Sequence, residues 1–417
     1  MKQLPRLPLL PLAACLGLIA STGAAHAEAN PYYIGASQAF TRDSNVLRQA
    51  EGSESSDTVS TTSLLAGFDQ PISRQRLYAN GTLRHNRYSN LSQLNSNGYS
   101  LTGGIDWATV ENLSGKLAVA LNRNPAQYGS PDAPQLTTRN LETSRQASAT
   151  AALGVVTKLT LEAGLTHRSL DYSAPEWLFR ENKQDAANVG LRYAPSDLLK
   201  LGVGLRETRG EYPHPHNTDP DTPEHFRRHD LDLTGTWVAS GASTLDGRLS
   251  FGRQRYDAFT ARNFSGATGL LEWRWKPTGK LSLNTLLTRD TGNEASFTSY
   301  LNGALTQAGD SSRLTNLLRI QGNYEMTAKI QLTATASNAH RSLVNSFDFG
   351  VLGSGSESGT DTTTQAALGL RYAPTRNILL GCDVSRESRS VSIPAGSTLS
   401  YPYKANVYGC SGQILLQ

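Results

Sequence analysis

The chain lacks the long apolar run that a membrane-spanning helix needs. Beyond residue 27 there is no stretch of ~18 consecutive apolar residues, and the mean hydropathy of the chain is negative. The i, i+3, i+4 spacing of amphipathic helices is almost absent as well. What repeats instead is a two-residue alternation of apolar and polar side chains, in segments of about ten residues. We therefore expect an all-β fold whose strands have one apolar and one polar face.

Excess charge and cysteine are also scarce. The formal net charge of +4 includes two basic residues of the N-terminal segment, Lys2 and Arg6, and no clustered basic face is evident. A nucleic-acid partner is not expected, because binding it requires such a face. Two cysteines remain after residue 27, Cys382 and Cys410. An even number suits a disulfide in an oxidising compartment.

The first 27 residues have the organisation of a secretory signal peptide. A basic head precedes an apolar stretch from Leu7 to about Ala20, and Ala25-His26-Ala27 provides a small-x-small cleavage site. Residues 1–27 are thus expected to be the signal peptide and residues 28–417 a single domain. Leu12-Ala13-Ala14-Cys15 resembles a lipid-attachment box, but the apolar core continues past Cys15, which favours the later site.

The alternating segments predict eighteen strands. They lie at about 31–46, 57–69, 74–90, 98–109, 115–125, 143–156, 159–173, 185–194, 199–212, 227–239, 243–257, 264–276, 280–291, 312–326, 330–343, 361–373, 377–391 and 400–416. An even number returns both termini to the same side, as in single-chain bacterial barrels. We predict a transmembrane, antiparallel, up-and-down β-barrel of about 18 strands, porin-like, in the outer membrane of a Gram-negative bacterium.

The connections between these strands alternate between short and long. Short ones include Gln70-Pro71-Ile72-Ser73, Thr157-Lys158 and Pro374-Thr375-Arg376, and long polar ones lie at 47–56, 126–142, 213–226, 292–311 and 344–360. Outer-membrane barrels have short periplasmic turns and longer extracellular loops. The alternation therefore places both termini in the periplasm.

Aromatic side chains lie at one end of the strands, just before the short turns. They are Phe68, Trp107, Tyr193, Trp237, Trp275, Tyr324 and Tyr372. General β propensity would scatter aromatics along the strands, whereas Tyr and Trp favour the membrane–water boundary. We expect these residues to form a periplasmic aromatic girdle.

Alternation also assigns the two faces of each strand. Leu201, Val203 and Leu205 are expected to face lipid, because a charge at the bilayer midplane costs roughly 2–4 kcal/mol. The other parity is expected to line a water-filled pore, since a barrel of this width is too wide for side chains to fill. The candidate pore-lining residues are Asp106, Glu162, Arg168, Arg192, Arg206, Asp230, Asp232, Glu272, Arg274, Arg319, Arg371 and Asp383. They either form solvated ladders that rigidify the wall or bind a polar or anionic solute.

Arginines crowd the outer ends of the strands. They are Arg84, Arg87, Arg123, Arg168, Arg206, Arg209, Arg253, Arg255, Arg289, Arg341, Arg386 and Arg389. They either contact the phosphates of anionic lipid headgroups, which suit planar bidentate donors, or are solvated at the rim.

The last predicted hairpin places two cysteines opposite each other. Its turn centres near Gly396, and Cys382 and Cys410 are equidistant from that residue. Both share the parity of expected lipid-facing neighbours such as Leu380 and Ile414. Non-hydrogen-bonded cross-strand pairs approach the separation that a disulfide needs. We predict a Cys382–Cys410 bridge, the alternative being two free thiols.

No catalytic residue, metal or cofactor is expected. The loop around His214, His216, Asp219, Asp221, Glu224, His225 and His229 has the residue types of a metal site, but its four prolines indicate an irregular loop and not the ordered ligands of a zinc site. His167-Arg168-Ser169-Leu170 recurs as His340-Arg341-Ser342-Leu343, with each His on the same strand face as its Ser. Nucleophilic catalysis also needs an oriented base and an oxyanion site, which nothing in the sequence indicates.

The N-terminal strand carries a family resemblance. Residues 33–48 (YIGASQAFTRDSNVLR), 56–63 (SDTVSTTS), 75–79 (QRLYA) and the final 413–417 (QILLQ) resemble the EpsL-type outer-membrane proteins of exopolysaccharide operons, which are associated with exosortase/PEP-CTERM clusters. The resemblance spans essentially the whole mature chain and has no catalytic signature. It implies a role in exopolysaccharide biosynthesis or export, with exopolysaccharide and export-machinery proteins as partners beside the outer-membrane lipids.

Three functions therefore remain open at the level of sequence. The first is a channel for polysaccharide export, which the family resemblance favours. The second is a general diffusion or uptake porin for small polar solutes, which the size of the barrel favours. The third is a non-conducting structural barrel, which requires that loops such as 292–311 or 344–360 fold inward.

Overall fold

The structure is a computed structural model that describes residues 30–129, 136–156, 158–215, 223–257, 262–291, 314–348, 354–395 and 399–417. The predicted signal peptide and the segment 292–311 lie outside these residues. Within them no helix is long and apolar enough to cross a membrane.

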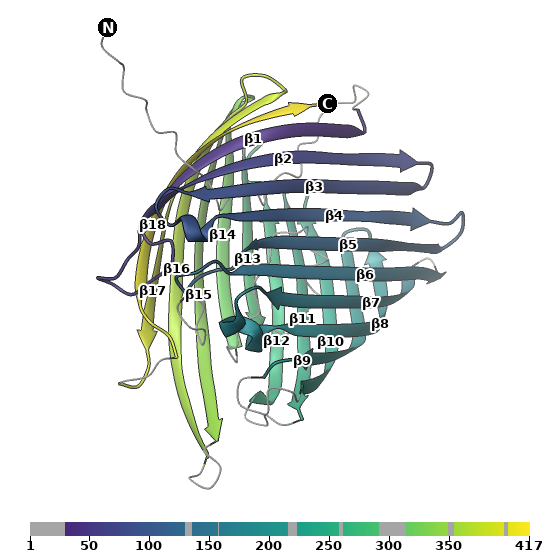
Figure 1. Ribbon diagram of the computed structural model, residues 1–417. Coiled ribbons are helices and arrows are strands. Elements are labelled where there is room, and N and C mark those ends of the chain that lie inside the picture. The colour runs from purple at the N-terminus through teal and green to yellow at the C-terminus, as the bar shows by residue number, and fades with distance from the viewer. Residues whose placement is uncertain are drawn as a thin grey trace.

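Eighteen strands form one closed antiparallel sheet, shown in Figure 1. They are β1 (Tyr32–Asp43), β2 (Asp57–Ile72), β3 (Gln75–Tyr88), β4 (Ser96–Ala108), β5 (Leu113–Pro125), β6 (Leu141–Val156), β7 (Leu159–Tyr172), β8 (Asn182–Ser196), β9 (Leu199–Tyr212), β10 (Glu224–Ser240), β11 (Ser243–Tyr256), β12 (Phe264–Trp275), β13 (Leu281–Asp290), β14 (Leu314–Thr327), β15 (Ile330–Asp348), β16 (Ser354–Tyr372), β17 (Ile378–Ser392) and β18 (Tyr403–Leu416). Two short 3₁₀ helices, η1 (Ser92–Leu94) and η2 (Pro175–Arg180), lie in the connections.

Each strand pairs with the next along the chain, and the first strand pairs with the last. The register of β1 against β18 runs from Ile34↔Leu416 to Asp43↔Val407. Closure leaves no unpaired sheet edge, which is a requirement for backbone that crosses a bilayer. The predicted up-and-down barrel is therefore confirmed.

One predicted long loop is mostly strand. We expected a loop at 344–360, but β15 and β16 stay paired up to Asp348↔Ser354 and extend beyond the neighbouring strands (Figure 1). The alternation of apolar and polar residues ends earlier, because this part of the hairpin projects past the membrane and needs no lipid-facing side chains.

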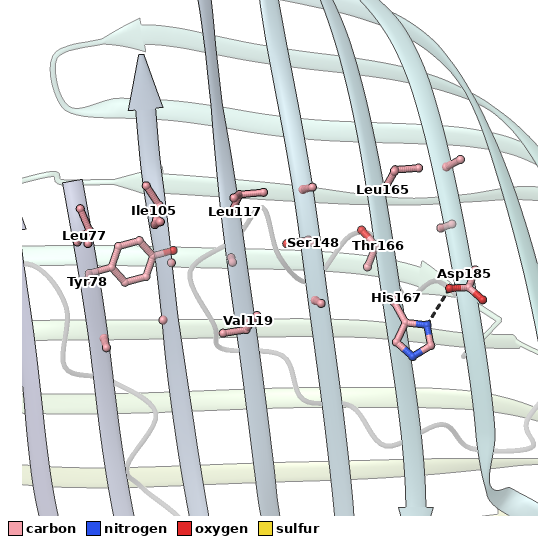
Figure 2. A pocket seen from close by; sticks show the side chains of 18 of the residues that line it. Leu77, Tyr78, Ile105, Leu117, Val119, Ser148, Leu165, Thr166, His167 and Asp185 are labelled. Atoms are coloured by element: carbon pink, nitrogen blue, oxygen red, sulfur yellow. Dashed lines mark hydrogen bonds and ion pairs between the residues drawn. The ribbon is translucent and has the colours of Figure 1, made fainter. Parts of the chain in front are cut away.

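The outer face of the barrel carries a continuous apolar belt. On β9, Leu201, Val203 and Leu205 are 48%, 47% and 63% exposed, whereas Arg206 on the other parity is 4% exposed. Figure 2 shows a shallow apolar groove in this belt over β3–β8, with Leu117 among its lining residues. An apolar surface of this extent is stable only against lipid.

The structure places all of the girdle aromatics on the outer face, at the strand ends that lead into the short turns. Phe68, Tyr193, Trp237, Tyr324 and Tyr372 are each at least 40% exposed. The other two are Trp107 and Trp275, and Trp107 lies over Gly115 of the next strand, where a Cβ atom would be 2.5 Å from the indole ring. The periplasmic ends of these strands thus carry aromatic rings, and all but that of Phe68 belong to Tyr or Trp, which favour a headgroup boundary.

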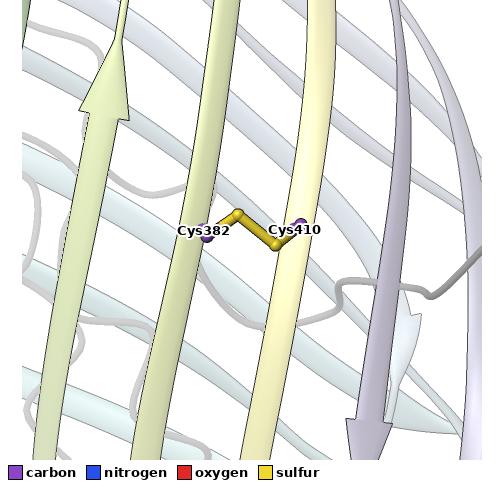
Figure 3. Close-up of a disulfide and its surroundings, with 2 residues drawn as sticks. All are labelled: Cys382 and Cys410. Atoms are coloured by element: carbon purple, nitrogen blue, oxygen red, sulfur yellow. A yellow bond between two sulfur atoms is a disulfide. The ribbon is translucent and has the colours of Figure 1, made fainter.

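The predicted disulfide is present between the last two strands. Cys382 of β17 and Cys410 of β18 are direct register partners and are joined by a bond between their sulfur atoms (Figure 3). The bond lies on the outer face, on the same parity as the exposed side chains of Leu380, Val384 and Ile414. It therefore links β17 to β18 within the apolar belt.

Candidate functional site: the barrel interior

The inner face of the barrel is polar. All of the candidate pore-lining residues predicted above alternate with exposed outward-facing side chains and therefore lie on the inner face. Glu272, 8% exposed, lies between Leu271 and Trp273, for example, which are 40% and 37% exposed. That the pore-lining residues contact a solute stays a prediction.

Five of the inward side chains, from β9, β10 and β11, form what we call the β9–β11 charge cluster: Arg206, Arg228, Asp230, Asp232 and Arg248. Asp230 lies between two guanidinium groups, 3.2 Å from Nη2 of Arg206 and 2.9 Å from Nη2 of Arg228. Asp232 accepts from Arg206 Nε at 3.0 Å.

Arg228 is the most deeply buried member of this cluster, with a side chain that is 0% exposed. Beside its pair with Asp230, it donates to the hydroxyl oxygens of Thr291 and Thr268 at 2.7 and 2.8 Å. Buried charges persist only where each has a partner. The cluster therefore holds this part of the wall in one arrangement. Sequence reasoning missed Arg228, although its parity with Asp230 and Asp232 would have found it.

Strands β7 to β12 line a half-open cavity of about 330 Å³, and Arg206, Asp232 and Arg248 of the charge cluster form part of its lining. Its charged lining residues are Glu162, Arg192, Lys200, Arg206, Asp232, Asp246, Arg248 and Arg274. Arg192 pairs with Glu162 at 3.0 Å, and Arg274 pairs with Asp246. Gly190 and Gly204 face each other across β8 and β9 and expose the backbone between these charges.

A second set of charges lies at the periplasmic end. Arg76 pairs with Asp69 and with Asp106, the latter at 3.4 Å, and Lys116 lies 3.7 Å from Asp106. Both cations also lie over the ring of Tyr78, at 5.2 and 5.3 Å from its centroid. These groups are about half exposed, so each pair contributes little to stability. With two cations and two carboxylates, they give this mouth a charged lining whose net charge is close to zero.

Toward the extracellular end of β16, Asp361 is the centre of another buried group. It accepts from Arg341 Nε at 2.7 Å and from Ser400 Oγ at 2.7 Å, and Arg389 Nε lies 3.7 Å away. Arg389 also donates to the carbonyl oxygen of Gly129, which belongs to the connection after β5. The connection after β5 thus reaches across the mouth of the barrel to β17.

The extracellular mouth is partly covered by a packed group of apolar side chains, which we call the mouth cluster. It comprises Leu47, Val59, Tyr88, Leu94, Ala126, Tyr128, Leu136, Leu170, Tyr172, Ala174 and Trp177. Its members come from the extracellular ends of β2, β3 and β7 and from the connections after β1, β3, β5 and β7. The described parts of these loops therefore fold inward over one side of the lumen.

Sequence reasoning did not predict the mouth cluster. The loops were expected to be polar and exposed, yet Trp177 of η2 is 2% exposed and stacks edge-on against Tyr172, with ring centroids 5.3 Å apart. The only available signal was a large aromatic residue inside a connection, where no periodicity assigns a partner.

The arginines at the outer strand ends divide between the two faces. Arg84, Arg168, Arg206, Arg341 and Arg389 lie on the inner face, so for these five strand parity rules out the alternative of contact with lipid phosphates. The outward-facing members are Arg87, Arg123, Arg209, Arg253, Arg255, Arg289 and Arg386.

The histidines of the two His–Ser repeats lie on the outer face and contact side chains of the neighbouring strands. His167 pairs with Asp185 at 2.7 Å, and His340 hydrogen-bonds to Thr362 at 3.0 Å. No group of three potential metal ligands occurs in the described part of the chain. His214 lies 3.3 Å from Glu181, whereas His216, Asp219 and Asp221 fall outside the described residues.

Comparison with known proteins yields structural neighbours only. No family model matches the chain, and no curated protein matches it. The outer-membrane protein OpdK of Pseudomonas aeruginosa is 11% identical with a TM-score of 0.48, covering 92% of this chain and 99% of that one. OccK2 (OpdF) of the same species, solved with glucuronate, is 12% identical with a TM-score of 0.47, covering 93% and 98%. The siderophore receptor PiuA of Acinetobacter baumannii is 8% identical with a TM-score of 0.43, covering 93% and 82%.

These identities and TM-scores are too low to transfer any property of those proteins to this chain. Its own surface makes the assignment: a closed antiparallel barrel with an even number of strands, an outward apolar belt, aromatic strand ends and a polar interior. The protein is a transmembrane β-barrel of a Gram-negative outer membrane.

Proposed function

We propose that the protein is a diffusion channel through which small polar solutes enter, with a preference for anions. The observation that carries this proposal is the charge of the cavity between β7 and β12. Five cationic and three acidic side chains line it. Lys200 forms no ion pair within the described residues and so adds a positive charge that no neighbour neutralises.

The geometry of these charges suits transient binding. Arg192 and Arg274 are each paired with one carboxylate and are 39% and 49% exposed. Their guanidinium groups therefore remain open on the lumen side, where a planar donor can hold a carboxylate or a phosphate. Because such exposed pairs are weak, a passing anion can displace them and leave again.

The size of the cavity favours a small solute. A volume of about 330 Å³ is at the lower end of the range for small-molecule sites. The mouth cluster and the contact between Arg389 and Gly129 narrow the extracellular entrance further. A solute the size of a sugar acid fits this space.

The test is the reversal potential of the purified barrel in planar bilayers under a potassium chloride gradient. The wild type is expected to pass chloride in preference to potassium. Arg192→Gln with Arg274→Gln leaves three cations against three acids in the cavity, so its permeability ratio should approach one. Arg386→Gln, on the outer face, is the matched control and should leave selectivity unchanged. A cation-selective wild type would contradict the proposal.

The second candidate is a channel for exopolysaccharide export, and it rests on the resemblance of residues 33–48 to the EpsL-type family. Deletion of the gene separates the two candidates. Loss of secreted polysaccharide with unchanged uptake of small acids would support export. Reduced uptake with normal polysaccharide would support the diffusion channel.

A further inference from the structure

The outer surface over β9, β10 and β11 holds an unusual row of like charges. Arg227 of β10 is the register partner of Arg209 on β9 and of Arg255 on β11. All three side chains are exposed and lie on the outward face. Neighbouring strands are ≈4.8 Å apart, so the three arginines, which we call the arginine row, span roughly 10 Å.

Like charges directly opposite each other destabilise a sheet, and the neighbours of this row do little to offset them. Beneath it lie Glu207, His229 and Arg253, again as register partners. Glu207 pairs with Arg209 at 2.7 Å. Within the described residues no acidic side chain forms an ion pair with Arg227, Arg253 or Arg255. Of the other acidic side chains nearby, Asp185 of β8 is the register partner of Arg209 and pairs with His167, Glu211 lies 3.9 Å from Lys183, and Asp257 follows Arg255 by two residues. Three of the four arginines therefore have no ion pair within the described residues.

The height of the row matches the outer headgroup layer. Arg227 is ten residues from the girdle residue Trp237 on the same strand. At 3.3 Å per residue and a strand tilt of about 40°, this separation corresponds to about 25 Å along the barrel axis, which is the height of the apolar band of such barrels. One step below Glu207, His229 and Arg253, the side chains of Leu205, Leu231 and Phe251 are 63%, 41% and 50% exposed.

Below and beside the arginine row, the apolar belt contains a groove of about 780 Å³ over β9 to β15. Outward-facing Gly235, Gly247 and Gly269 form its floor, and residues such as Leu233 and Leu249 form its walls. Arg289 also lines it and donates from Nη1 to Asn316 Oδ1 at 3.1 Å. The groove therefore combines space for hydrocarbon with cationic groups at the membrane boundary.

The groove over β3–β8 in Figure 2 provides a contrast within the same molecule. It is of similar size, about 990 Å³, and is also apolar. Its polar rim is neutralised, because His167 pairs with Asp185 and Arg209 pairs with Glu207, both at 2.7 Å. The groove over β9 to β15 differs, because Arg227, Arg253 and Arg255 at its extracellular end have no ion pair within the described residues.

We infer that this surface binds a phosphorylated glycolipid of the outer leaflet. The arginine row holds its phosphate groups through charge-assisted bidentate hydrogen bonds, and an acyl chain lies along the glycine-floored groove. A second copy of this chain is a poorer occupant, because it would bring further arginines of the same row toward an already cationic surface.

The inference is tested on the full barrel in a non-ionic detergent, by native mass spectrometry with bisphosphorylated lipid A as the probe. The wild type should retain this lipid. Arg227→Gln with Arg255→Gln should weaken retention by about thirtyfold. Each arginine near an anionic lipid surface strengthens binding by about fivefold, and the double variant lacks two of them. Arg386→Gln, an isolated outward arginine whose register partners are Ala366 and Asn406, is the control and should bind as the wild type does.

A second variant tests the acyl arm. A Cβ atom at Gly247 would meet Leu271 at 3.5 Å, an ordinary contact, so Gly247→Leu fills the groove without disturbing the backbone. It should weaken retention of lipid A while leaving the arginine row intact. Equal retention by the arginine double variant and the wild type would overturn the inference. So would equal retention of dephosphorylated lipid A, or full competition by inorganic phosphate at equal concentration, which would indicate a site for free anions.

Discussion

Replacement of Arg228 by methionine tests the assignment of the two faces most sharply. The side chain is fully buried on the inner face and bonds to Asp230 at 2.9 Å and to Thr291 and Thr268 at 2.7 and 2.8 Å. Removing one partner of a buried pair leaves an uncompensated charge and costs about 3–5 kcal/mol. Because Asp230 keeps Arg206 at 3.2 Å, we expect the lower part of that range.

The adjacent residue supplies the matched control. Arg227 has the same side chain but points outward and is exposed, so Arg227→Met should change the free energy of unfolding by less than about 0.5 kcal/mol. Both variants are compared by urea-induced unfolding in micelles of a zwitterionic detergent whose headgroup carries no phosphate, so that Arg227 has no phosphate to bind. If Arg228→Met costs no more than Arg227→Met, the interior charge cluster is not formed and the parity argument for β10 fails.

Two further predictions concern the disulfide and the mouth cluster. Cys382→Ser with Cys410→Ser removes a crosslink with a sequence separation of 28 and should lower the free energy of unfolding by up to about 3–4 kcal/mol. A reductant should lower the thermal midpoint of the wild type to that of the double variant. Unchanged midpoints in the reduced wild type and in the double variant would contradict the bridge. Trp177→Ala removes a side chain that is 2% exposed and packed on Tyr172. It should raise single-channel conductance and expose the loops to protease without lowering the midpoint of barrel unfolding, whereas unchanged conductance would show that the mouth cluster does not narrow the pore.

Strand number, strand faces and the Cys382–Cys410 register could be predicted because one physical constraint acts on every strand. Each strand separates lipid from water, so side chains must alternate with period two. The same constraint made Leu205 and Arg206 distinguishable as outward and inward residues. The hairpin that continues to Asp348 and Ser354 escaped prediction because, outside the membrane, neither face needs apolar side chains.

The charge partners and the mouth cluster could not be predicted in the same way. Parity assigns Arg206 and Asp230 to one face. Their ion pair, however, depends on the register between β9 and β10, which the alternation of side chains does not determine. Trp177 is buried through contacts with chain segments far away in sequence, and loops have no period that would indicate them. The cationic excess of the cavity became visible only when β7 to β12 were placed side by side.

Conductance in planar bilayers tests the central claim most directly. If the barrel is a diffusion channel with an excess of cationic groups in its lumen, the purified protein should form discrete, stable ion-conducting pores with a permeability ratio that favours chloride. Addition of a small dicarboxylate should produce brief, concentration-dependent interruptions of the current. A barrel that inserts into the bilayer but conducts no ions would contradict the account.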